Sequence, residues 1–266
     1  MNALDRAVHD LMRKASQDVI LPRYRNLAAS EIIEKGSDDL VTVADREAEA
    51  MLAEGLAAID PSLAIVGEEA THDDPTLLDR LGSDCWIIDP IDGTHNFAHG
   101  QPPFGILIAR AEGGLCQSGW IYDCLTGRLC HAHRGAGAFV NGERIAARTT
   151  GHQPPVAAIS VMFMNQEQRE KVKAQIVPDY SLVDIPRCAA EQYPRLVLGV
   201  NDVSIFERTL AWDHAAGVLL LNEAGGKAAR PDGRPYRVDE AHLPGLIGAS
   251  SPALWDDLAE RLAALS

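Results

Sequence analysis

The stretch from Trp86 to Thr94, which reads Trp-Ile-Ile-Asp-Pro-Ile-Asp-Gly-Thr, constrains this chain more than any other part of its sequence. Its apolar beginning predicts a short buried strand, which ends abruptly in two carboxylates, Asp89 and Asp92. Pro90 fixes φ and Gly93 frees it, so the turn is tight and its shape is specified. Such a turn aims the two carboxylates at one point, where they repel each other unless a proton or a cation lies between them. Hard oxygen ligands of this kind favour Mg²⁺, Mn²⁺ or Ca²⁺.

The next two residues, Gly93 and Thr94, offer backbone N–H groups that suit a phosphate if a helix begins there. Other interpretations compete with a metal site. An Asx-type turn at a strand end often carries acids that have no function. An EF-hand calcium loop beginning at Asp89 needs a glutamate at its twelfth position, where this chain has a glycine. Phosphatases of the haloacid dehalogenase type use the motif D-x-D-G-T, and here proline stands two residues before Asp92, so that interpretation is kept as a rival.

Composition narrows the class of protein. A chain of 266 residues can bury a large core, either as one domain or as two intimate halves. The formal net charge of −14 argues against a nucleic-acid partner. The beginning of the chain lacks the features of a signal peptide, and no apolar run approaches the length of a membrane span. We therefore expect a cytoplasmic protein without a membrane partner.

The cysteines fit reduced thiols, because five is an odd number and no C-x-x-C pair occurs. The segment Cys130-His131-Ala132-His133 has the residue types of a zinc cluster. No second ligand pair follows it at zinc spacing, so we do not expect a zinc site there.

The first half, residues 1–148, is expected to combine helices with a largely antiparallel sheet. Apolar spacing predicts an amphipathic helix over 2–25 that ends near Pro22, and a second helix from Asp45 to about Ile59. Gly36 to Asp39 is predicted to be a polar, mobile loop. Strands are expected at 64–66, 86–88, 104–109, 119–122, 128–131 and 138–140.

The second half, residues 149–266, follows a boundary marked by glycine and prolines at 146–155. Strand and helix patterns alternate beyond it, which is typical of a layered α/β structure. Trp212 to Gly217 reads Trp-Asp-His-Ala-Ala-Gly, with Asp213 at the start of an Ala-rich helix. Asp213 is either an N-cap or a carboxylate that the fold brings to the centre. His214 points to a different side of the helix, so we expect a packed or solvent-facing histidine and not a ligand.

Taken together, these segments resemble the inositol monophosphatase superfamily of Mg²⁺-dependent, lithium-sensitive phosphatases. The resemblance covers nearly the whole chain. It rests on Lys35 to Asp45, Gly67 to Glu69, Trp86 to Phe97, Gly135 to Gly142 and Trp212 to Gly217.

The resemblance implies a site for two or three Mg²⁺ ions, with Mn²⁺ as an alternative. Asp45 and Thr94 would orient and deprotonate the attacking water, and Glu68 would belong to the same catalytic group. The metal ligands would be Glu68, Asp89, Asp92 and Asp213, together with the backbone carbonyl of Ile91.

The resemblance also implies how a small phosphorylated substrate is held. The loop around Lys35 would close over the site. The fold would be α/β, a layered α-β-α-β-α sandwich of the inositol monophosphatase and fructose-1,6-bisphosphatase type, commonly assembled as a homodimer. The substrate contacts would be Asp92, Gly93, Thr94, Ala189, Glu207 and Asp213.

The sequence departs from the inositol-specific pattern where the leaving group would lie. Members that cleave inositol phosphates have E-x-G-[LI]-x-x-W-D, whereas here Glu207 is one residue closer to the tryptophan, the glycine is missing and Arg208 is present. Arg187 to Ala190 replaces the family's small-residue run, and His95 replaces its usual Thr or Ser. Arg187, Arg208 or Glu191 are candidates for recognising another alcohol or a second anion.

The expected activity is therefore hydrolysis of a phosphomonoester, with inositol 1-phosphate as the default substrate. Histidinol phosphate, a 3′(2′),5′-bisphosphate nucleotide and fructose 1,6-bisphosphate are alternatives for the same site. A hypothesis of a different class is a regulatory relative that keeps the fold and binds protein partners. The roles of His95 and Cys188 stay open.

Overall fold

The computed structural model describes residues 1–36, 39–240 and 242–265, and within these ranges the side chains at 29, 33–36 and 39 are outside the description. Its helices are α1 (Ala3–Ala15), α2 (Leu21–Arg23), α3 (Val43–Ile59), α4 (Glu68–Asp73), α5 (Thr94–Ala98), α6 (Gln166–Gln175), α7 (Ala189–Val197), α8 (Ala211–Glu223) and α9 (Pro252–Ala263). Its strands are β1 (Ile32–Gly36), β2 (Asp39–Thr42), β3 (Ala64–Gly67), β4 (Cys85–Asp92), β5 (Gly105–Glu112), β6 (Leu115–Asp123), β7 (Leu129–His133), β8 (Gly137–Val140), β9 (Glu143–Ile145), β10 (Val156–Ile159), β11 (Ser181–Leu182), β12 (Val203–Phe206), β13 (Lys227–Ala229) and β14 (Leu246–Ala249).

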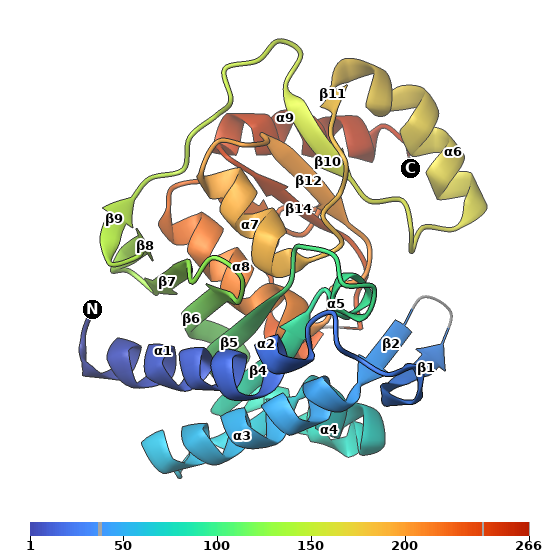
Figure 1. The fold of residues 1–266 in the computed structure, drawn as a ribbon. Coiled ribbons are helices and arrows are strands. Elements are labelled where there is room, and N and C mark those ends of the chain that lie inside the picture. The colour runs from blue at the N-terminus through green and yellow to red at the C-terminus, as the bar shows by residue number, and fades with distance from the viewer. Residues whose placement is uncertain (37–38, 241, 266) are drawn as a thin grey trace.

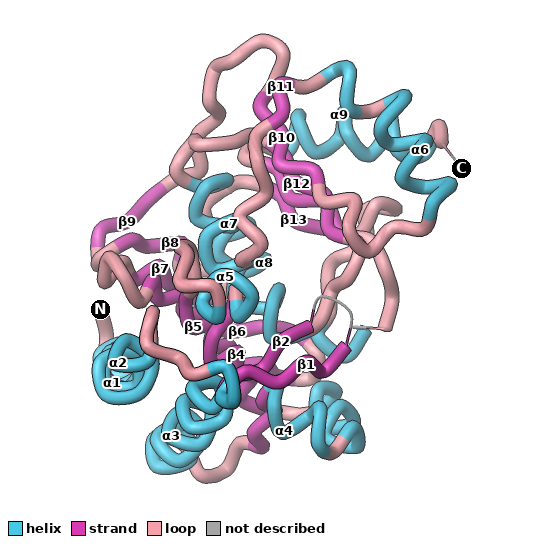
Figure 2. Tube along the Cα trace, turned by 45° about the vertical axis from the view of Figure 1, so that its right-hand side comes forward, coloured by secondary structure: helices cyan, strands magenta, loops and turns pink. Residues whose placement is uncertain are grey.

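The elements stack in five layers that alternate between helices and sheets (Figure 1). From the bottom of the view these are α1 with α3, the sheet of β3 to β9, α7 with α8, the sheet of β10 to β14, and α6 with α9. This is the α-β-α-β-α sandwich that the family resemblance implies. Figure 2 shows the same order from another side, with α7 and α8 between the two sheets and the β1–β2 hairpin beside α4.

The larger sheet has seven strands in the order β3-β4-β5-β6-β7-β8-β9. Only β3 and β4 are parallel, and the other neighbours pair antiparallel, as expected from the turns between them. Side chains alternate between the faces of a strand. On β4, Trp86 and Ile88 pack against α1 and α3, whereas Cys85 and Ile87 pack against α7 and α8. Burial on both faces explains why this strand is continuously apolar until its carboxylates.

Helix α8 lies between the sheets and is buried over most of its length. Its small residues are required by close packing. A Cβ atom at Gly217 would lie 1.9 Å from Cδ2 of Tyr193, and one at Gly119 on β6 would lie 2.7 Å from Cα of Ala216. The Ala-Ala-Gly run therefore brings the beginning of α8 close to the larger sheet.

The smaller sheet has the order β11-β10-β12-β14-β13, and α6 and α9 cover its outer face. The segment between β9 and β10 is irregular, as expected for 146–155. The division into 1–148 and 149–266 stays a prediction, because α7 and α8 of the second half share one hydrophobic core with the first sheet.

The first helical run ends near Pro22, as predicted: α1 continues through a π-helical turn, η1 (Ser16–Ile20), into α2, which ends at Arg23. Pro22 stands in the first turn of α2, where a backbone N–H is not required. The strands on either side of the loop predicted at 36–39 were not predicted: Ile32 to Glu34 pairs antiparallel with Leu40 to Thr42, and Gly36 and Asp39 are the strand ends. Residues 37 and 38 and the side chain of Lys35 lie outside the described residues, so the mobility expected there is untested.

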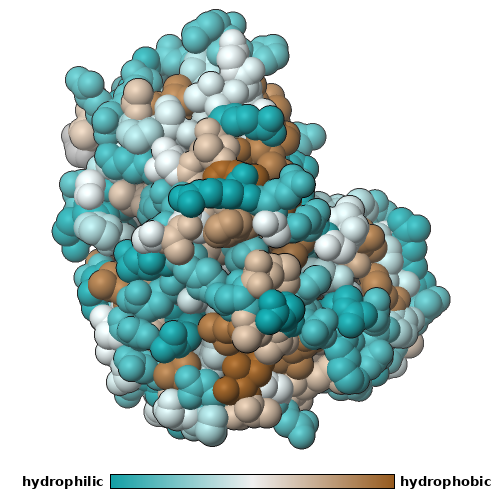
Figure 3. All heavy atoms as spheres, turned by 90° about the vertical axis from the view of Figure 1, so that its left-hand side faces the viewer, coloured by the Kyte–Doolittle hydropathy of each residue, from teal (hydrophilic) through white to brown (hydrophobic). Residues whose placement is uncertain are grey.

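The surface is as hydrophilic as the many charged residues of the sequence lead one to expect. The face turned to the left in Figure 1 is mainly hydrophilic, with hydrophobic residues in small separate patches (Figure 3). Within the described ranges no helix is long and apolar enough to cross a membrane. All five cysteines are buried free thiols.

Candidate active site

The carboxylates of β4 meet a third carboxylate from the second half of the chain. The ladder between β4 and β5 is interrupted between Asp89 and Asp92, at the position of Pro90, which has no N–H to donate to a ladder. Carboxylate oxygens of Asp89, Asp92 and Asp213 all lie within 4.8 Å of one another. The turn chemistry of the sequence thus produces the convergence that it predicts.

Asp213 reaches this point from the first turn of α8. The N-cap of that helix is Leu210, so Asp213 is not the capping residue, and its carboxylate joins those of β4. Position in the first turn places the carboxylate near the partial positive end of the helix. The guanidinium of Arg208 lies beside it, with Nη2 3.7 Å from Oδ2.

Asp45 and Thr94 form a hydrogen-bonded pair next to these carboxylates. Oδ2 of Asp45 accepts from the backbone N–H of Thr42 at 2.8 Å, which is one half of the capping box of α3, and it also accepts from the Thr42 hydroxyl at 2.6 Å. Oγ1 of Thr94 lies 3.1 Å from Oδ1 of Asp45 and 2.8 Å from the carbonyl oxygen of Ile91. A hydroxyl has one proton, so Thr94 donates to one of these acceptors at a time. Burial raises the pKa of Asp45 to about 7, which is in the range of a group that exchanges protons at neutral pH.

Glu68 is the first residue of α4, directly after β3. The turn is held by Glu49, whose carboxylate accepts from the backbone N–H groups of Glu69 and Ala70 at 2.8 Å each. A Cβ atom at Gly67 would lie 2.5 Å from the Glu49 oxygens, so glycine is required for this contact. Sequence analysis missed Glu49. Its position four residues after Asp45 on one helix face was the available signal.

The electrostatics of the carboxylate group favour a cation. Burial raises the pKa of Asp89 well above its usual value, and the charges of Glu68, Asp92, Asp213 and Asp45 raise it further. Burial also raises the pKa of Asp92, although the backbone N–H of Ala190, 2.5 Å from Oδ2, opposes that shift. Oδ1 of Asp89 is buried and has no hydrogen-bond partner among the described residues. An unpaired buried carboxylate oxygen surrounded by other carboxylates fits a divalent cation that prefers oxygen ligands.

A pocket of about 190 Å³ opens above these groups. Gly93, with φ of 86°, turns the chain from β4 into α5, and a Cβ atom there would lie 2.9 Å from the carbonyl oxygen of Pro103. The pocket is lined by the predicted metal ligands and substrate contacts: Glu68, Asp89, Ile91, Asp92, Gly93, Thr94, Ala189, Glu207 and Asp213. Asp45 contacts Thr94 from the next layer. The predicted site residues with described side chains therefore lie together.

The rim of the pocket carries the residues that depart from the family pattern. Arg187, His95, Cys188 and Arg208 line it, and the Arg208 guanidinium lies over the ring of Phe163, 4.5 Å from its centroid. Glu191 is different, because it forms ion pairs with Arg128 at 2.6 Å and with Arg195 at 2.8 Å. Its predicted role in substrate recognition is therefore unsupported by its contacts.

His214 has a structural role, as expected. Its Nδ1 lies 2.7 Å from the hydroxyl of Tyr193, and its Nε2 lies 3.0 Å from the carbonyl oxygen of Arg208. Burial lowers its pKa to about 3, so the neutral ring accepts from Tyr193 and donates to Arg208. Sequence analysis did not foresee that this histidine fixes the backbone of Arg208.

Asn96 is a second residue that sequence reasoning missed. Its side-chain amide donates to the carbonyl oxygens of Pro103 and Pro186, both at 2.9 Å. It thereby joins the segment after β4 to the segment before α7. Its place in the Thr-His-Asn-Phe run was visible, but its partners are not adjacent in sequence.

Comparisons with known proteins agree with this geometry. A sequence model described as the inositol monophosphatase family matches residues 2–266. The chain is 35% identical to inositol-1-monophosphatase of Bacillus subtilis over 208 residues, which cover 77% of each protein. It is 32% identical to a histidinol-phosphatase of Chlorobaculum parvum over 232 residues, 86% of this chain and 85% of that one. Its structure resembles a solved IMPase of Thermotoga maritima with a TM-score of 0.82 and 26% identity, over 100% of this chain and 98% of that one.

Proposed function

The chain belongs to the inositol monophosphatase family of phosphomonoesterases, and from this premise we propose that it hydrolyses a small phosphorylated alcohol with the help of two or three Mg²⁺ ions. The convergence of Asp89, Asp92 and Asp213 within 4.8 Å of one another is the observation that carries the proposal. Glu68 and the carbonyl oxygen of Ile91 complete the oxygen ligands that we assign to the metal site. Mn²⁺ has the same preference for oxygen ligands and is the alternative ion.

Divalent ions at such a site neutralise phosphate charge and lower the pKa of a bound water toward neutrality. The protein's own groups then perform three tasks. The backbone N–H groups of Gly93 and Thr94 would hold a phosphate oxygen, Thr94 would orient the attacking water through its hydroxyl, and Asp45 would take up the proton that Thr94 passes on. As the water oxygen bonds to phosphorus, the ester P–O bond breaks and the leaving alkoxide takes a proton from solvent water. Since the pKa of Asp45 is about 7, this carboxylate can hold that proton at physiological pH.

This mechanism needs no nucleophilic side chain, and this separates it from the haloacid dehalogenase rival with Asp92 as nucleophile. Oδ2 of Asp92 accepts from the backbone N–H of Ala190, which supports a role in orienting ligands and substrate. Trapping a phosphorylated Asp92 would contradict the proposed mechanism.

Inositol 1-phosphate is the default substrate, supported by the Bacillus subtilis relative. Histidinol phosphate is the second candidate, supported by the Chlorobaculum parvum relative and by Glu207 at the pocket, whose carboxylate suits a cationic leaving group. Arg208, on the same rim, suits a second anion instead, as in fructose 1,6-bisphosphate or a bisphosphate nucleotide. Ala189 and Glu207 are the residues that we expect to contact the leaving group.

The test is phosphate release from these four substrates in Mg²⁺, with and without Li⁺. Asp89→Asn should lower turnover roughly 10²–10³-fold. Asp79→Asn is the matched control, because it makes the same change on an exposed carboxylate outside the pocket. Normal turnover by Asp89→Asn at saturating Mg²⁺ would refute the metal site, whereas no turnover of any substrate by the unmodified chain would point to another phosphoester.

We further propose that the enzyme is an Li⁺-inhibited cytoplasmic homodimer in which the segment around Lys35 closes over the substrate. The family and the absence of cysteine pairing support these assignments. Light scattering during size-exclusion chromatography measures the assembly state. Protection of the 32–42 segment from proteolysis by substrate and Mg²⁺ measures the closure.

A further inference from the structure

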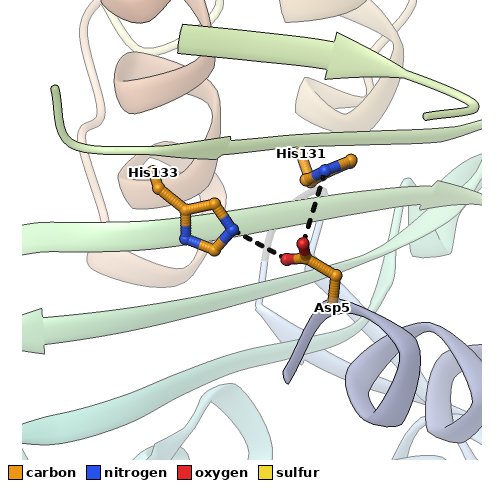
Figure 4. A group of neighbouring side chains, drawn as sticks. All are labelled: Asp5, His131 and His133. Carbon is orange, nitrogen blue, oxygen red and sulfur yellow. Dashed lines mark hydrogen bonds and ion pairs between the residues drawn. The ribbon is translucent and has the colours of Figure 1, made fainter. Parts of the chain in front are cut away.

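A second group of potential metal ligands lies where α1 crosses the larger sheet (Figure 4). His131 and His133 are two residues apart on β7, so both side chains leave the same face of the sheet. Asp5, in the first turn of α1, points toward both rings. Nε2 of His133 is 2.7 Å from Oδ1 of Asp5, and Nε2 of His131 is 3.7 Å from Oδ2. None of the three residues lines the catalytic pocket.

His131 is the member of this group that the protein leaves unsatisfied. Its side chain is 2% exposed, and Nε2 is the ring nitrogen directed at Asp5. The 3.7 Å between Nε2 and Oδ2 of Asp5 is too long for a hydrogen bond. Stacking on the ring of Phe139, with centroids 5.0 Å apart, holds the imidazole in this orientation. A cation between Nε2 and the Asp5 carboxylate would fill this gap with a ligand bond.

The spacing of the segment 130–133 gave no reason to expect zinc, but α1 brings a third ligand to it, and we propose that Asp5, His131 and His133 bind one Zn²⁺ ion, with water in the fourth position. Two imidazole nitrogens and one carboxylate oxygen suit Zn²⁺ and exclude Mg²⁺ as the preferred ion. Zn–N bonds of about 2.0 Å in a tetrahedron place neighbouring ligand atoms about 3.3 Å apart. The two measured separations, 2.7 and 3.7 Å, lie on either side of that value. The side chain of His133 is 20% exposed and provides a path for the ion.

The surroundings of the group supply what a zinc site needs. Nδ1 of His133 lies 2.9 Å from the hydroxyl of Ser118, so it can donate there once Nε2 is coordinated. Asp5 keeps two donors, the indole N–H of Trp120 at 3.1 Å and the backbone N–H of Asn2 at 2.9 Å.

The bound ion would join α1 to β7, two elements that lie far apart in the sequence. Only the folded chain brings these three residues together, so Zn²⁺ would stabilise the fold. The site would lie apart from the groups that hydrolyse the substrate, because none of its three residues lines the catalytic pocket.

The test is a titration of the full chain with Zn²⁺ in excess Mg²⁺, which occupies the carboxylate site. We expect one Zn²⁺ per chain by calorimetry, a higher melting temperature, and, with Co²⁺ in place of Zn²⁺, the visible absorption of a four-coordinate nitrogen-ligated ion. His131→Phe, which keeps the stacking on Phe139, and His133→Gln should each lower Zn²⁺ affinity about 100-fold or more. His152→Ala, which changes an exposed histidine elsewhere, and Asp213→Asn should keep the affinity of the unmodified chain.

Two outcomes would overturn the proposal. One is the absence of any Zn²⁺ binding that survives excess Mg²⁺. The other is binding that Asp213→Asn removes and His131→Phe leaves intact, since the ion would then occupy the catalytic group. Circular dichroism establishes that each variant is folded. If His133→Gln does not fold, His131→Phe decides the outcome alone.

Discussion

The cluster of Asp89, Asp92 and Asp213 and the cluster of Asp5, His131 and His133 differ in how the buried carboxylate charge is stabilised. Around Asp89 the neighbours are carboxylates, and all of their charges raise its pKa. Around Asp5, burial opposes ionisation, but the backbone of Asn2 and the imidazole of His133 outweigh it and hold the pKa below its usual value. The carboxylates around Asp89 need a cation to offset their charges, whereas the Asp5 carboxylate is already stabilised by its own donors before any ion binds. The carboxylates around Asp89 destabilise the metal-free fold and bind metal, which is typical of a catalytic site and not of a site that only stabilises the fold.

The largest effect is expected from Asp89→Asn, which should lower kcat roughly 10²–10³-fold. Without metal, the same variant should be more stable than the unmodified chain. The raised pKa means that the folded chain binds more protons than the unfolded chain, so its stability falls as pH rises from 3.8 through the raised pKa. Thermal melts in EDTA across pH measure this. A lower melting temperature for the variant above neutral pH would contradict the comparison.

Asp45→Asn should lower kcat about 10²-fold and change KM little, because it removes a proton acceptor and not a metal ligand. Thr94→Val should act in the same direction, since Asp45 reaches the pocket through the Thr94 hydroxyl. Combining the two changes should cost little more than either alone. A fully multiplicative loss would show that the two residues act separately.

Asp5→Asn should leave kcat unchanged and lower stability by about 2 kcal/mol, because the carboxylate accepts from Trp120, His133 and Asn2. The stabilisation is present above pH 3.8 and disappears as pH falls through the lowered pKa of Asp5. Urea unfolding at two pH values provides the measurement. An equal destabilisation at very low pH would mean that packing, and not charge, holds α1.

The smallest effect is expected from Arg208→Gln, which removes the guanidinium 3.7 Å from Asp213. Mg²⁺ affinity should increase a few-fold, because a competing cation is lost from an exposed position. KM for a substrate with a second anionic group should rise about 10-fold, and KM for inositol 1-phosphate should change less. Arg234→Gln, an exposed arginine paired with Asp232, is the control.

The convergence of Asp89 and Asp92 is predicted from local signals, whereas the layered fold and the arrival of Asp213 are implied by the family resemblance. The turn at Pro90 and Gly93 is encoded within a few residues, and the small residues after Asp213 signal a close approach of α8. The Asp5 group could not be predicted, since its assembly depends on how α1 lies across the sheet. The β1–β2 hairpin was missed because polar residues between two short apolar pairs look like a loop. Glu49 was missed because helical carboxylates are usually solvent-exposed.

Gly217 lies one helical turn beyond Asp213 and touches the ring of Tyr193, where no Cβ atom fits. The same tyrosine holds His214, and His214 holds the carbonyl of Arg208. A methyl group at Gly217 would push against this ring and move a carboxylate and a guanidinium together. A substitution at Gly217 would therefore lower catalytic activity although this residue does not line the pocket. A screen of variants for activity would then detect buried packing positions as well as pocket residues.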